Sequence, residues 1–420
     1  MTFKELETQV SEYVYGEDSG MLRIALASLI STRMKIGEPV WMILIGASSS
    51  GKSQVLRPLA MTDSKFIHRV DDITENTFLS GAKPGKAGGE VSFLKKVGSH
   101  GILVISDLTV LFSRNSESKA AILSQFRMIY DGEMVKHVGN SPKPIEWKGS
   151  LGVIAGSTPS IYGHFEEVAD MGERFIYYRM KSYNTEKATR LSLDRKVFGK
   201  DLDDKLSKMY AEYVKDCVKG ASNKPLNGLS SEVHERILQI AMFAAKLRTP
   251  AHYDKYLKQI DRVPISEMPM RVALQLSAIA KGLMVMSLND TGSDVLNESD
   301  IGYVEWCAYS LANEERRACL KLLATVSWET PMATQDIADK MGLDTSITRM
   351  HLQHLTAIGI LERKGGEGSF QWKYTRKEEY NIVKRLEGIA SNEAYTISLM
   401  TSEDTSENDA FINAQWGEAS

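Results

Sequence analysis

The chain has 420 residues, of which 43% are apolar and 25% are charged, and its formal net charge is −3. This is the composition of a globular protein and excludes a disordered or fibrous chain, while the length predicts two or three domains. With so small a net charge, any nucleic-acid partner would be met by local basic patches and not by an overall positive field.

Cys217, Cys307 and Cys319 are far apart and contain no CxxC pair. This pattern indicates neither a disulfide framework nor a zinc site. The first residues show no apolar signal segment, and no apolar run reaches the roughly 18 residues that span a membrane. We therefore expect a cytoplasmic protein with no membrane partner.

Residues 1–38 have apolar positions at three-to-four spacing and predict an N-terminal helical segment. Short apolar runs then alternate with helical patterns. The predicted strands are residues 40–45, 66–70, 101–107, 150–157 and 175–180. Strands alternating with helices are typical of a parallel sheet between two helical layers, so we expect an α/β fold with a three-layer αβα domain over residues 39–184.

The first predicted strand runs into a phosphate-binding motif. Residues 46–53, GASSSGKS, fit the pattern GxxxxGK[ST] in full. In such a loop backbone N–H groups surround phosphate oxygens, the lysine (Lys52) reaches the β- and γ-phosphates, and the hydroxyl of Ser53 ligates Mg²⁺. We therefore predict that the chain binds ATP with Mg²⁺. The expected nucleotide contacts are Gly46, Ser48, Ser49, Ser50, Gly51, Lys52, Ser53 and Gln54.

Asp107 ends the predicted strand GILVISD, where a carboxylate would hold the Mg²⁺ ion together with Ser53. Many ATPases of this layout place a glutamate directly after this aspartate to activate the attacking water, but here the next residue is Leu108. Either another acid serves or hydrolysis is slow. The polar candidates nearby in the sequence are Glu90, Asp131 and Glu133.

Two segments interrupt the α/β pattern. Residues 134–139 and 144–149 flank a short turn that contains proline, and they predict a β-hairpin directly before the strand at 150–157. A glycine-rich stretch at residues 80–90 forms an insertion ahead of Asp107.

Together these stretches resemble the AAA+ ATPases of the branch with a hairpin before the first sensor strand and an insert in the second helix. MCM-type replicative helicases and bacterial enhancer-binding activators belong to this branch. The similarity covers residues 35–312 and is strongest to AAA+ ATPases of phages and integrated elements, through the stretches YDGE, WKG and IAGSTP. It implies a helical lid over residues 185–312 and a ring of subunits, expected to be a hexamer.

The resemblance also implies roles for single residues. Ser157 or Thr158 would be the first sensor of the γ-phosphate, and Arg271 would be the second sensor on the lid helix. Arg174, or else Arg179, would reach into the neighbouring subunit's site as an arginine finger. The alternatives are that Arg174 forms a surface ion pair and that Arg271 lies on a solvated helix face.

In this family the hairpin and the insert face a central pore. The implied contacts to a DNA backbone are Lys83, Lys86, Lys136, His137 and Lys143, which in the alternative are solvated loop residues. The insert reads GKAGGE and lacks the GAFTGA signature of the enhancer-binding activators, which counts against transcription activation.

Residues 313–380 predict a winged-helix domain, and residues 381–420 an acidic, mobile tail. The first short helix would start at Thr334 as N-cap, and the second at Asp344 or Thr345. A strand, a glycine turn and a second strand follow. The alternative is a winged helix that serves protein contacts or ring assembly.

The second helix of this domain would present two faces. Its buried face is expected to comprise Ile347, Leu352, Leu355 and Ile358. Its DNA-facing side is expected to comprise Ser346, Arg349, His351 and Gln353. In the wing, Arg363, Lys364 and Lys373 would meet phosphates.

These expectations describe an ATP-hydrolysing, ring-forming DNA helicase or helicase-like replication initiator of a phage or mobile element. Its partners would be DNA, further copies of the chain and replication proteins. One alternative is a DNA-binding regulator whose slow ATP turnover controls assembly. Another is a protein-remodelling or transcription-activating ATPase.

Overall fold

The computed structural model describes residues 1–14, 18–79, 92–137, 144–164, 174–181, 184–194, 196–222, 224, 226–250, 253–254, 256, 259–260, 262, 265–365 and 370–391. Its centre is a five-stranded sheet with the strand order β2-β3-β6-β1-β7, in which all neighbours run parallel. The strands are β1 (Trp41–Ile45), β2 (Ile67–Val70), β3 (His100–Ile105), β6 (Ser150–Ser157) and β7 (Ile176–Arg179). Each lies within two residues of a predicted strand, because buried parallel strands are continuous apolar runs.

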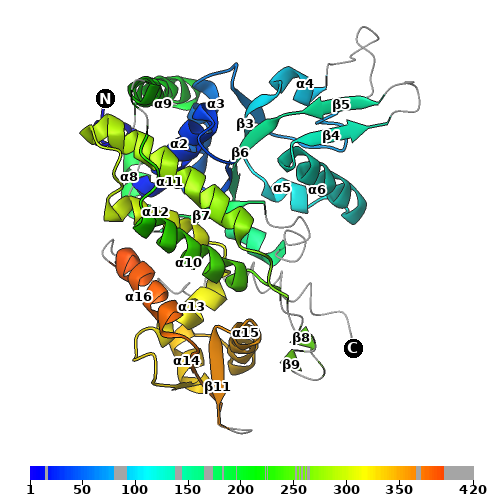
Figure 1. Cartoon of the computed structure of the whole chain (residues 1–420), viewed down its shortest axis with the longest axis vertical. Coiled ribbons are helices and arrows are strands. Elements are labelled where there is room, and N and C mark those ends of the chain that lie inside the picture. The colour runs from blue at the N-terminus through cyan, green and yellow to red at the C-terminus, as the bar shows by residue number, and fades with distance from the viewer. Residues whose placement is uncertain are drawn as a thin grey trace.

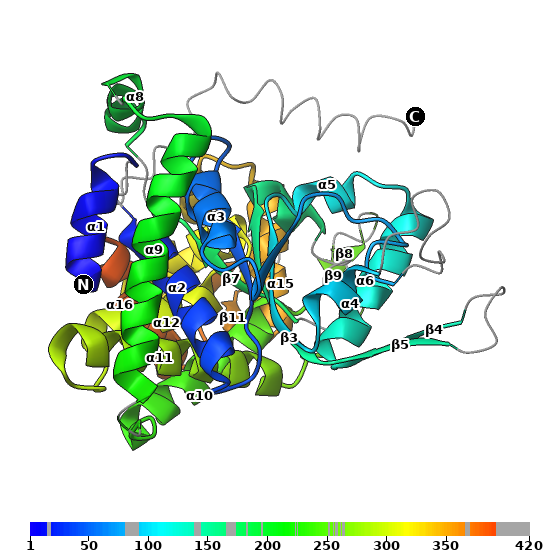
Figure 2. The ribbon, with the colours of Figure 1, turned by 90° about the horizontal axis from the view of Figure 1, so that it is seen from above.

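Helices cover both faces of this sheet (Figure 2). On one face lie α2 (Ser19–Met34) and α3 (Lys52–Met61), where Gly152 and Gly156 of β6 give room to Thr32 and Leu56. On the other face lie α5 (Thr109–Phe112) and α6 (Ser116–Tyr130), whose Phe126 packs edge-on against Trp41. The expected three-layer α/β arrangement is therefore confirmed.

The predicted N-terminal segment at residues 1–38 is helical, as expected. It forms two helices, α1 (Phe3–Ser11) and α2, and α2 is buried along most of its length against the sheet. Periodicity predicted the helices but not that the second one completes a layer of the α/β domain.

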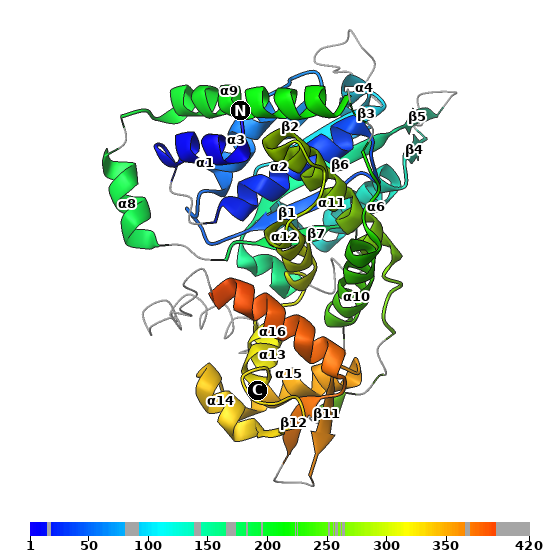
Figure 3. The same ribbon diagram turned by 60° about the vertical axis from the view of Figure 1, so that its left-hand side comes forward.

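The segment expected to be a lid contains α8 (Thr185–Asp194), α9 (Gly199–Ser222), α10 (Ser231–Leu247), α11 (Met270–Thr291), α12 (Glu298–Tyr309) and the short strands β8 (Tyr253–Asp254) and β9 (Gln259–Ile260). α9 packs along α3, and α11 along α2 (Figure 3). At Gly282 of α11 a Cβ atom would come within 2.1 Å of the Ala27 carbonyl oxygen, so only glycine allows this approach. Helices α9, α10, α11 and α12 therefore share one hydrophobic core with the sheet.

Helix α11 is fastened to the sheet by Gln275. The side-chain oxygen of Gln275 accepts a hydrogen bond from the Trp41 N–H at 2.8 Å, and its amide nitrogen donates to the Arg174 carbonyl at 2.8 Å. Among the described residues α11 is the one helix long and apolar enough to cross a membrane, yet 67% of its apolar window is buried inside the protein. Its apolar character is explained by its place in the core.

The predicted hairpin is present as β4 (Glu133–Lys136) paired antiparallel with β5 (Ile145–Lys148), and its tip lies outside the described residues. It projects from the α/β part beside α4 (Phe93–Val97) (Figure 1). The indole N–H of Trp147 donates to the Gly98 carbonyl at 2.7 Å and ties the hairpin to the turn before β3.

The C-terminal unit comprises α13 (Glu314–Leu323), β10 (Met332–Ala333), α14 (Thr334–Met341), α15 (Thr345–Ala357), β11 (Leu361–Lys364), β12 (Gln371–Tyr374) and α16 (Lys377–Ser391). The predicted order of two helices and a two-stranded ribbon is confirmed, and β10 adds a third strand beside β12. Asp344 caps α15 as expected, through a 2.7 Å hydrogen bond from the Ser346 N–H.

Two details of this unit correct the sequence prediction. Ala333 and not Thr334 is the N-cap of α14, because the Thr334 hydroxyl instead accepts a hydrogen bond from the Trp372 indole at 2.8 Å. Residues 381–391 belong to α16 and not to a tail, while residues 392–420 lie outside the described part of the chain.

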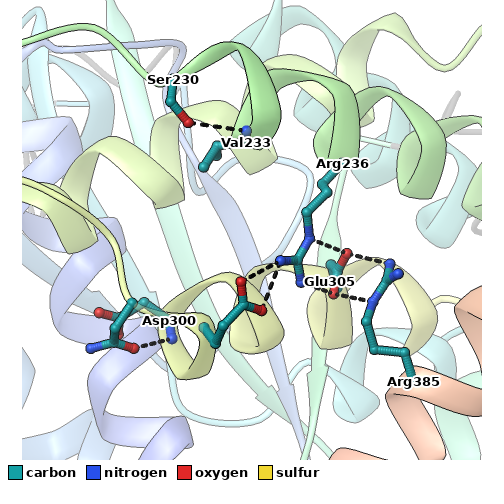
Figure 4. Close-up of polar contacts among 8 residues, drawn as sticks. Ser230, Val233, Arg236, Asp300, Glu305 and Arg385 are labelled. Carbon is teal, nitrogen blue, oxygen red and sulfur yellow. Dashed lines mark hydrogen bonds and ion pairs between the residues drawn. The ribbon is translucent and has the colours of Figure 1, made fainter.

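Helix α16 holds this unit against the rest of the molecule through a buried carboxylate (Figure 4). Glu305 of α12 is 1% exposed and lies between two arginines, Arg236 of α10 at 2.9 Å and Arg385 of α16 at 2.7 Å. Arg236 also pairs with the exposed Glu298 at 2.8 Å. Three helices that are distant in sequence thus meet at one acidic side chain.

Candidate nucleotide-binding site

The carboxyl ends of the parallel strands lie along one edge of the sheet. The residues that follow β1, β6, β3 and β2 are Gly46, Thr158, Ser106 and Asp71. The register pairs Ile45 with Ser157 and Val70 with Ile105, so these chain segments leave the sheet at the same level. In open α/β sheets ligands bind at this edge.

The backbone of the loop at residues 46–53 is shaped for a phosphate group. Gly51 has φ +91°, a conformation that favours glycine, and it precedes α3 as an N-cap that has no side chain to offer. A Cβ atom at Gly46 would lie 2.6 Å from the Ser50 hydroxyl oxygen, so a larger residue there would displace the Ser50 side chain. The first N–H groups of a helix have no partner within the helix and suit an anion. The residues present therefore fit a phosphate group.

Lys52 lies inside this loop. Its ammonium group donates to the carbonyl oxygens of Gly46 at 2.6 Å and Ala47 at 2.7 Å. Burial lowers the pKa of Lys52, and the nearby negative charge of Asp107 opposes this effect. The structure thus brings Lys52 and Asp107 together, as the sequence predicts.

The Asp107 side chain is exposed at this edge, and one of its oxygens accepts hydrogen bonds from the N–H group of Thr109 at 2.9 Å and from the Thr109 hydroxyl. Leu108, which follows, is 2% exposed, and its N–H donates to the Gly156 carbonyl at 2.8 Å. A side chain at position 108 therefore points into the core. A glutamate at position 108, where many ATPases of this layout carry one, would therefore be buried in this protein.

Two of the acids considered as replacements lie elsewhere. Asp131 ends α6 and Glu133 starts β4, and the backbone of Gly132 between them pairs with Gly149, directly before β6. They are therefore at the amino end of the sheet, opposite the phosphate loop, which excludes them as its catalytic acid. Glu90 lies outside the described residues.

Ser157 and Thr158 lie beside the loop, as expected for a residue that senses a phosphate. Ser157 is fully buried, its carbonyl accepts from the Gly46 N–H at 3.3 Å, and its hydroxyl lies 3.2 Å from the Thr158 carbonyl. The Thr158 hydroxyl is more accessible and lies 2.6 Å from the Ser160 hydroxyl. Of the two, Thr158 is better placed to reach a bound ligand.

The three arginines are distributed over both edges of the sheet. Arg174 precedes β7 at the amino edge, where its buried guanidinium pairs with Asp131 at 2.9 Å and lies over the Tyr130 ring. Arg271 is exposed in the first turn of α11, one turn before Gln275, and so lies at the same edge. Arg271 therefore does not lie beside the phosphate loop of its own chain, and its role as the second sensor stays a prediction.

Arg179, the second candidate for an arginine finger, is at the carboxyl edge. It ends β7, and the N–H of the next residue, Met180, donates to the Ile45 carbonyl at 2.8 Å. Its guanidinium is buried and pairs with Glu314 at 2.6 Å. Burial raises the pKa of Glu314, but the charge and hydrogen bond of Arg179 outweigh this and lower it overall. A role of Arg174 or Arg179 in a neighbouring subunit stays a prediction.

The lysines expected to bind DNA are only partly described, since Lys83, Lys86 and Lys143 lie outside the described residues. The Lys136 ammonium donates to the Glu75 carbonyl at 3.3 Å, the Asn76 side chain at 2.9 Å and the Leu79 carbonyl at 2.9 Å. All three ammonium protons of Lys136 are thus used in hydrogen bonds within the protein, which argues against a contact with a DNA phosphate. His137 is exposed.

In the C-terminal unit the exposed faces differ from the prediction. Ile347 is 45% exposed and His351 is buried, the reverse of what was expected, because α15 also packs against β9 and the His354 ring meets Tyr253 at 6.1 Å. Leu352, Leu355 and Ile358 are buried as predicted.

The cations of this unit are also partly engaged. Arg349 lies over the Phe370 ring at 5.6 Å and Arg363 over the same ring at 4.6 Å. Lys373 pairs with Glu362 at 3.0 Å, whereas Lys364 is exposed on the ribbon.

The sequence analysis missed two carboxylates at the phosphate edge, Asp71 and Asp72. The Ser106 hydroxyl donates to Asp71 at 2.7 Å, and Arg114 pairs with Asp72. They follow a predicted strand directly, which is the same signal that identified Asp107. That signal could have found them.

No protein-family model matches the chain, and a search of the curated proteins finds no match either. Within the described ranges no three His, Cys, Asp or Glu side chains are grouped so as to hold a metal ion. Magnesium that is bound through one hydroxyl, one carboxylate and phosphate oxygens does not require such a group.

Proposed function

We propose that this chain is an ATP-hydrolysing AAA+ protein that works on DNA as a ring-forming helicase or helicase-like replication initiator. The observation that carries the proposal is the complete phosphate loop, folded between a buried parallel strand and a helix N-terminus with Asp107 beside Lys52. The loop N–H groups and Lys52 would hold the phosphates, and Ser53 and Asp107 would hold Mg²⁺.

Support for a role on DNA comes from the C-terminal unit. Its helices and its three-stranded sheet have the order expected for a winged helix, and Lys364 is exposed on the ribbon. The resemblance to phage and mobile-element ATPases adds the replication role and the hexameric ring.

A DNA-binding regulator with slow ATP turnover is the second candidate. It is favoured by the buried Leu108 in place of the usual acid, and by the packing of α15 against β9, which covers part of the helix expected to read DNA. In that case ATP would control assembly or DNA access and would not drive continuous movement.

One set of assays separates these functions. ATP turnover is measured with and without single- and double-stranded DNA, for the wild type and for Lys52→Ala, together with strand unwinding. We expect DNA-stimulated turnover and unwinding, both lost in Lys52→Ala, because the loop needs its lysine to hold the phosphates. Turnover without unwinding would reject the helicase role, and ATP binding without turnover would favour the regulator. Failure of the wild type to bind ATP would reject both.

A further inference from the structure

Among the described residues, the phosphate site has no acid directly after Asp107 to take a proton from the attacking water, and Glu90 lies outside the described residues. Position 108 points into the core, and Asp131 and Glu133 are at the opposite edge of the sheet. Among the described residues that follow the strands at the phosphate edge, the acids are Asp107, Asp71 and Asp72. Because Asp107 is expected to hold Mg²⁺, the end of β2 remains as the source of a second carboxylate.

Asp71 contacts Ser106, the residue directly before Asp107. β2 and β3 are neighbours, and the register Val70 with Ile105 places Asp71 opposite Ser106. The Ser106 hydroxyl donates to Oδ1 of Asp71 at 2.7 Å, so the carboxylate leans across onto the strand that carries Asp107. Arg69 of β2 donates to the same oxygen at 2.9 Å.

Both of these contacts use Oδ1, and the side chain as a whole is 54% exposed. Partial burial raises the pKa of Asp71, but the hydrogen bonds from Ser106 and Arg69 outweigh this and lower it overall. Asp71 is therefore ionised at neutral pH, although the lowered pKa makes it a weaker base, and about half of its side chain is exposed to solvent. A general base needs to be ionised and accessible.

Asp72 differs from its neighbour in direction. It pairs with Arg114, which follows α5, so its carboxylate is directed toward the helical layer of α5 and α6 and not toward Ser106. The two adjacent carboxylates can therefore be compared directly, because only Asp71 contacts Ser106, the residue next to Asp107.

We propose that Asp71 is the general base of ATP hydrolysis in this chain, an assignment that rests on the proposed ATPase function. The oxygen of a water molecule would form a new bond to the γ-phosphorus while the bond between that phosphorus and the β–γ bridging oxygen breaks, giving ADP and phosphate. The proton released by the water would pass to the Asp71 carboxylate. Ser106 and Arg69 are positioning residues that fix this carboxylate.

The test compares Asp71→Asn with Asp72→Asn in the full chain. Turnover of ATP with Mg²⁺ is measured as kcat, and affinity is measured separately by equilibrium binding of a fluorescent ATP analogue. We expect Asp71→Asn to lower kcat by about 100-fold or more while the Kd changes by less than about threefold, since positioned bases contribute about 10²- to 10⁴-fold. Asp72→Asn is expected to change both quantities by less than about threefold.

Two further variants keep the test decisive if Asp71→Asn folds poorly. Asp71→Glu retains a carboxylate and should keep at least about tenfold more turnover than Asp71→Asn, whereas Ser106→Ala should lower kcat about three- to tenfold without loss of ATP binding. Equal activity of Asp71→Asn and wild type would overturn the assignment of Asp71 as the base but not the proposed ATPase function. So would parallel loss of binding and turnover in Asp71→Asn, Asp71→Glu and Ser106→Ala. Absence of turnover in the wild type would overturn the proposed ATPase with it.

Discussion

The guanidinium of Arg174 lies 2.9 Å and 3.0 Å from the two carboxylate oxygens of Asp131, and this pair joins the start of β7 to the end of α6. Arg174 is buried, while Asp131 is 55% exposed. The pair therefore holds in place an arginine that, by the resemblance to AAA+ ATPases, was expected to extend toward a neighbouring subunit.

We predict that Asp131→Asn lowers the free energy of unfolding by about 1–3 kcal/mol, because a buried guanidinium loses its charged partner while the other side of the pair remains near water. Urea unfolding measures the change. Glu186→Gln serves as the control, since Glu186 forms an exposed pair with Arg190 on α8, and it should cost less than about 0.5 kcal/mol. Unchanged stability in Asp131→Asn would mean that the pair does not hold Arg174, which would leave it available to a neighbour.

A second prediction concerns the start of the phosphate loop. Gly46→Ala should weaken ATP binding by about tenfold or more, because the new methyl group would lie 2.6 Å from the Ser50 hydroxyl oxygen and displace the loop. In the double variant with Ser50→Ala that oxygen is gone, and the nearest remaining atoms are 3.4 Å and 3.6 Å away. Calorimetric titration with ATP and Mg²⁺ should then give an affinity within about threefold of Ser50→Ala alone. If the double variant binds ATP as weakly as Gly46→Ala, contact with the Ser50 hydroxyl is not the cause of the loss.

A third prediction uses the two carboxylates that bind Arg236. Glu305 is buried between Arg236 and Arg385, whereas Glu298 is 76% exposed. Glu305→Ala should lower the free energy of unfolding by about 3–5 kcal/mol, since two arginines lose a buried partner, and Glu298→Ala by less than about 1 kcal/mol. Urea unfolding measures the loss of stability in each variant, and the rate of proteolytic cleavage near α16 is a second measure of it. Equal losses of stability in both variants would contradict the conclusion that Glu305 joins α10, α12 and α16.

A fourth prediction concerns pH. Burial lowers the pKa of His351 to about 4 and that of His354 to about 3, and the positive charge of Arg316 adds to both shifts. In the unfolded chain both histidines titrate near pH 6.5, so below that pH the unfolded state binds protons that the folded state excludes. Stability should therefore fall as the pH decreases, by about 2–4 kcal/mol between pH 6.5 and 5 for the two residues together.

The control for this pH effect is the double variant His351→Gln/His354→Gln. Its free energy of unfolding, measured in urea at the same pH values, should depend less steeply on pH than that of the wild type. The same slope in both proteins would show that these histidines are not buried against Arg316 and β9.

The sequence predicted the sheet well because each strand is a short buried run with polar residues at its ends. The phosphate loop was equally clear, since backbone shape favours glycine at position 51 and the charge of Lys52 suits a phosphate group. Asp107 followed from the same logic, and Asp71 would have followed had the residues after every strand been compared.

Other features depend on contacts between distant segments, which local patterns do not contain. The helical period shows that α2 is amphipathic or buried but not which surface it covers. On α15 the exposure of Ile347 and the burial of His351 depend on β9, about ninety residues earlier in the chain. The edge of the sheet on which Arg174 and Arg271 lie is set by the path of β7 and α11, and a motif alone does not reveal it.

The two hydrogen bonds of Gln275 have a consequence for how this protein can move. Any rotation of α11 away from the sheet would break both bonds and separate Gly282 from the Ala27 backbone, all inside the core. Backbone amides in the middle of α11 should therefore exchange with solvent only when the whole domain unfolds. If ATP hydrolysis drives movement in this chain, as proposed, α11 should keep its position on the sheet, and the moving segments should be those with fewer buried contacts to it.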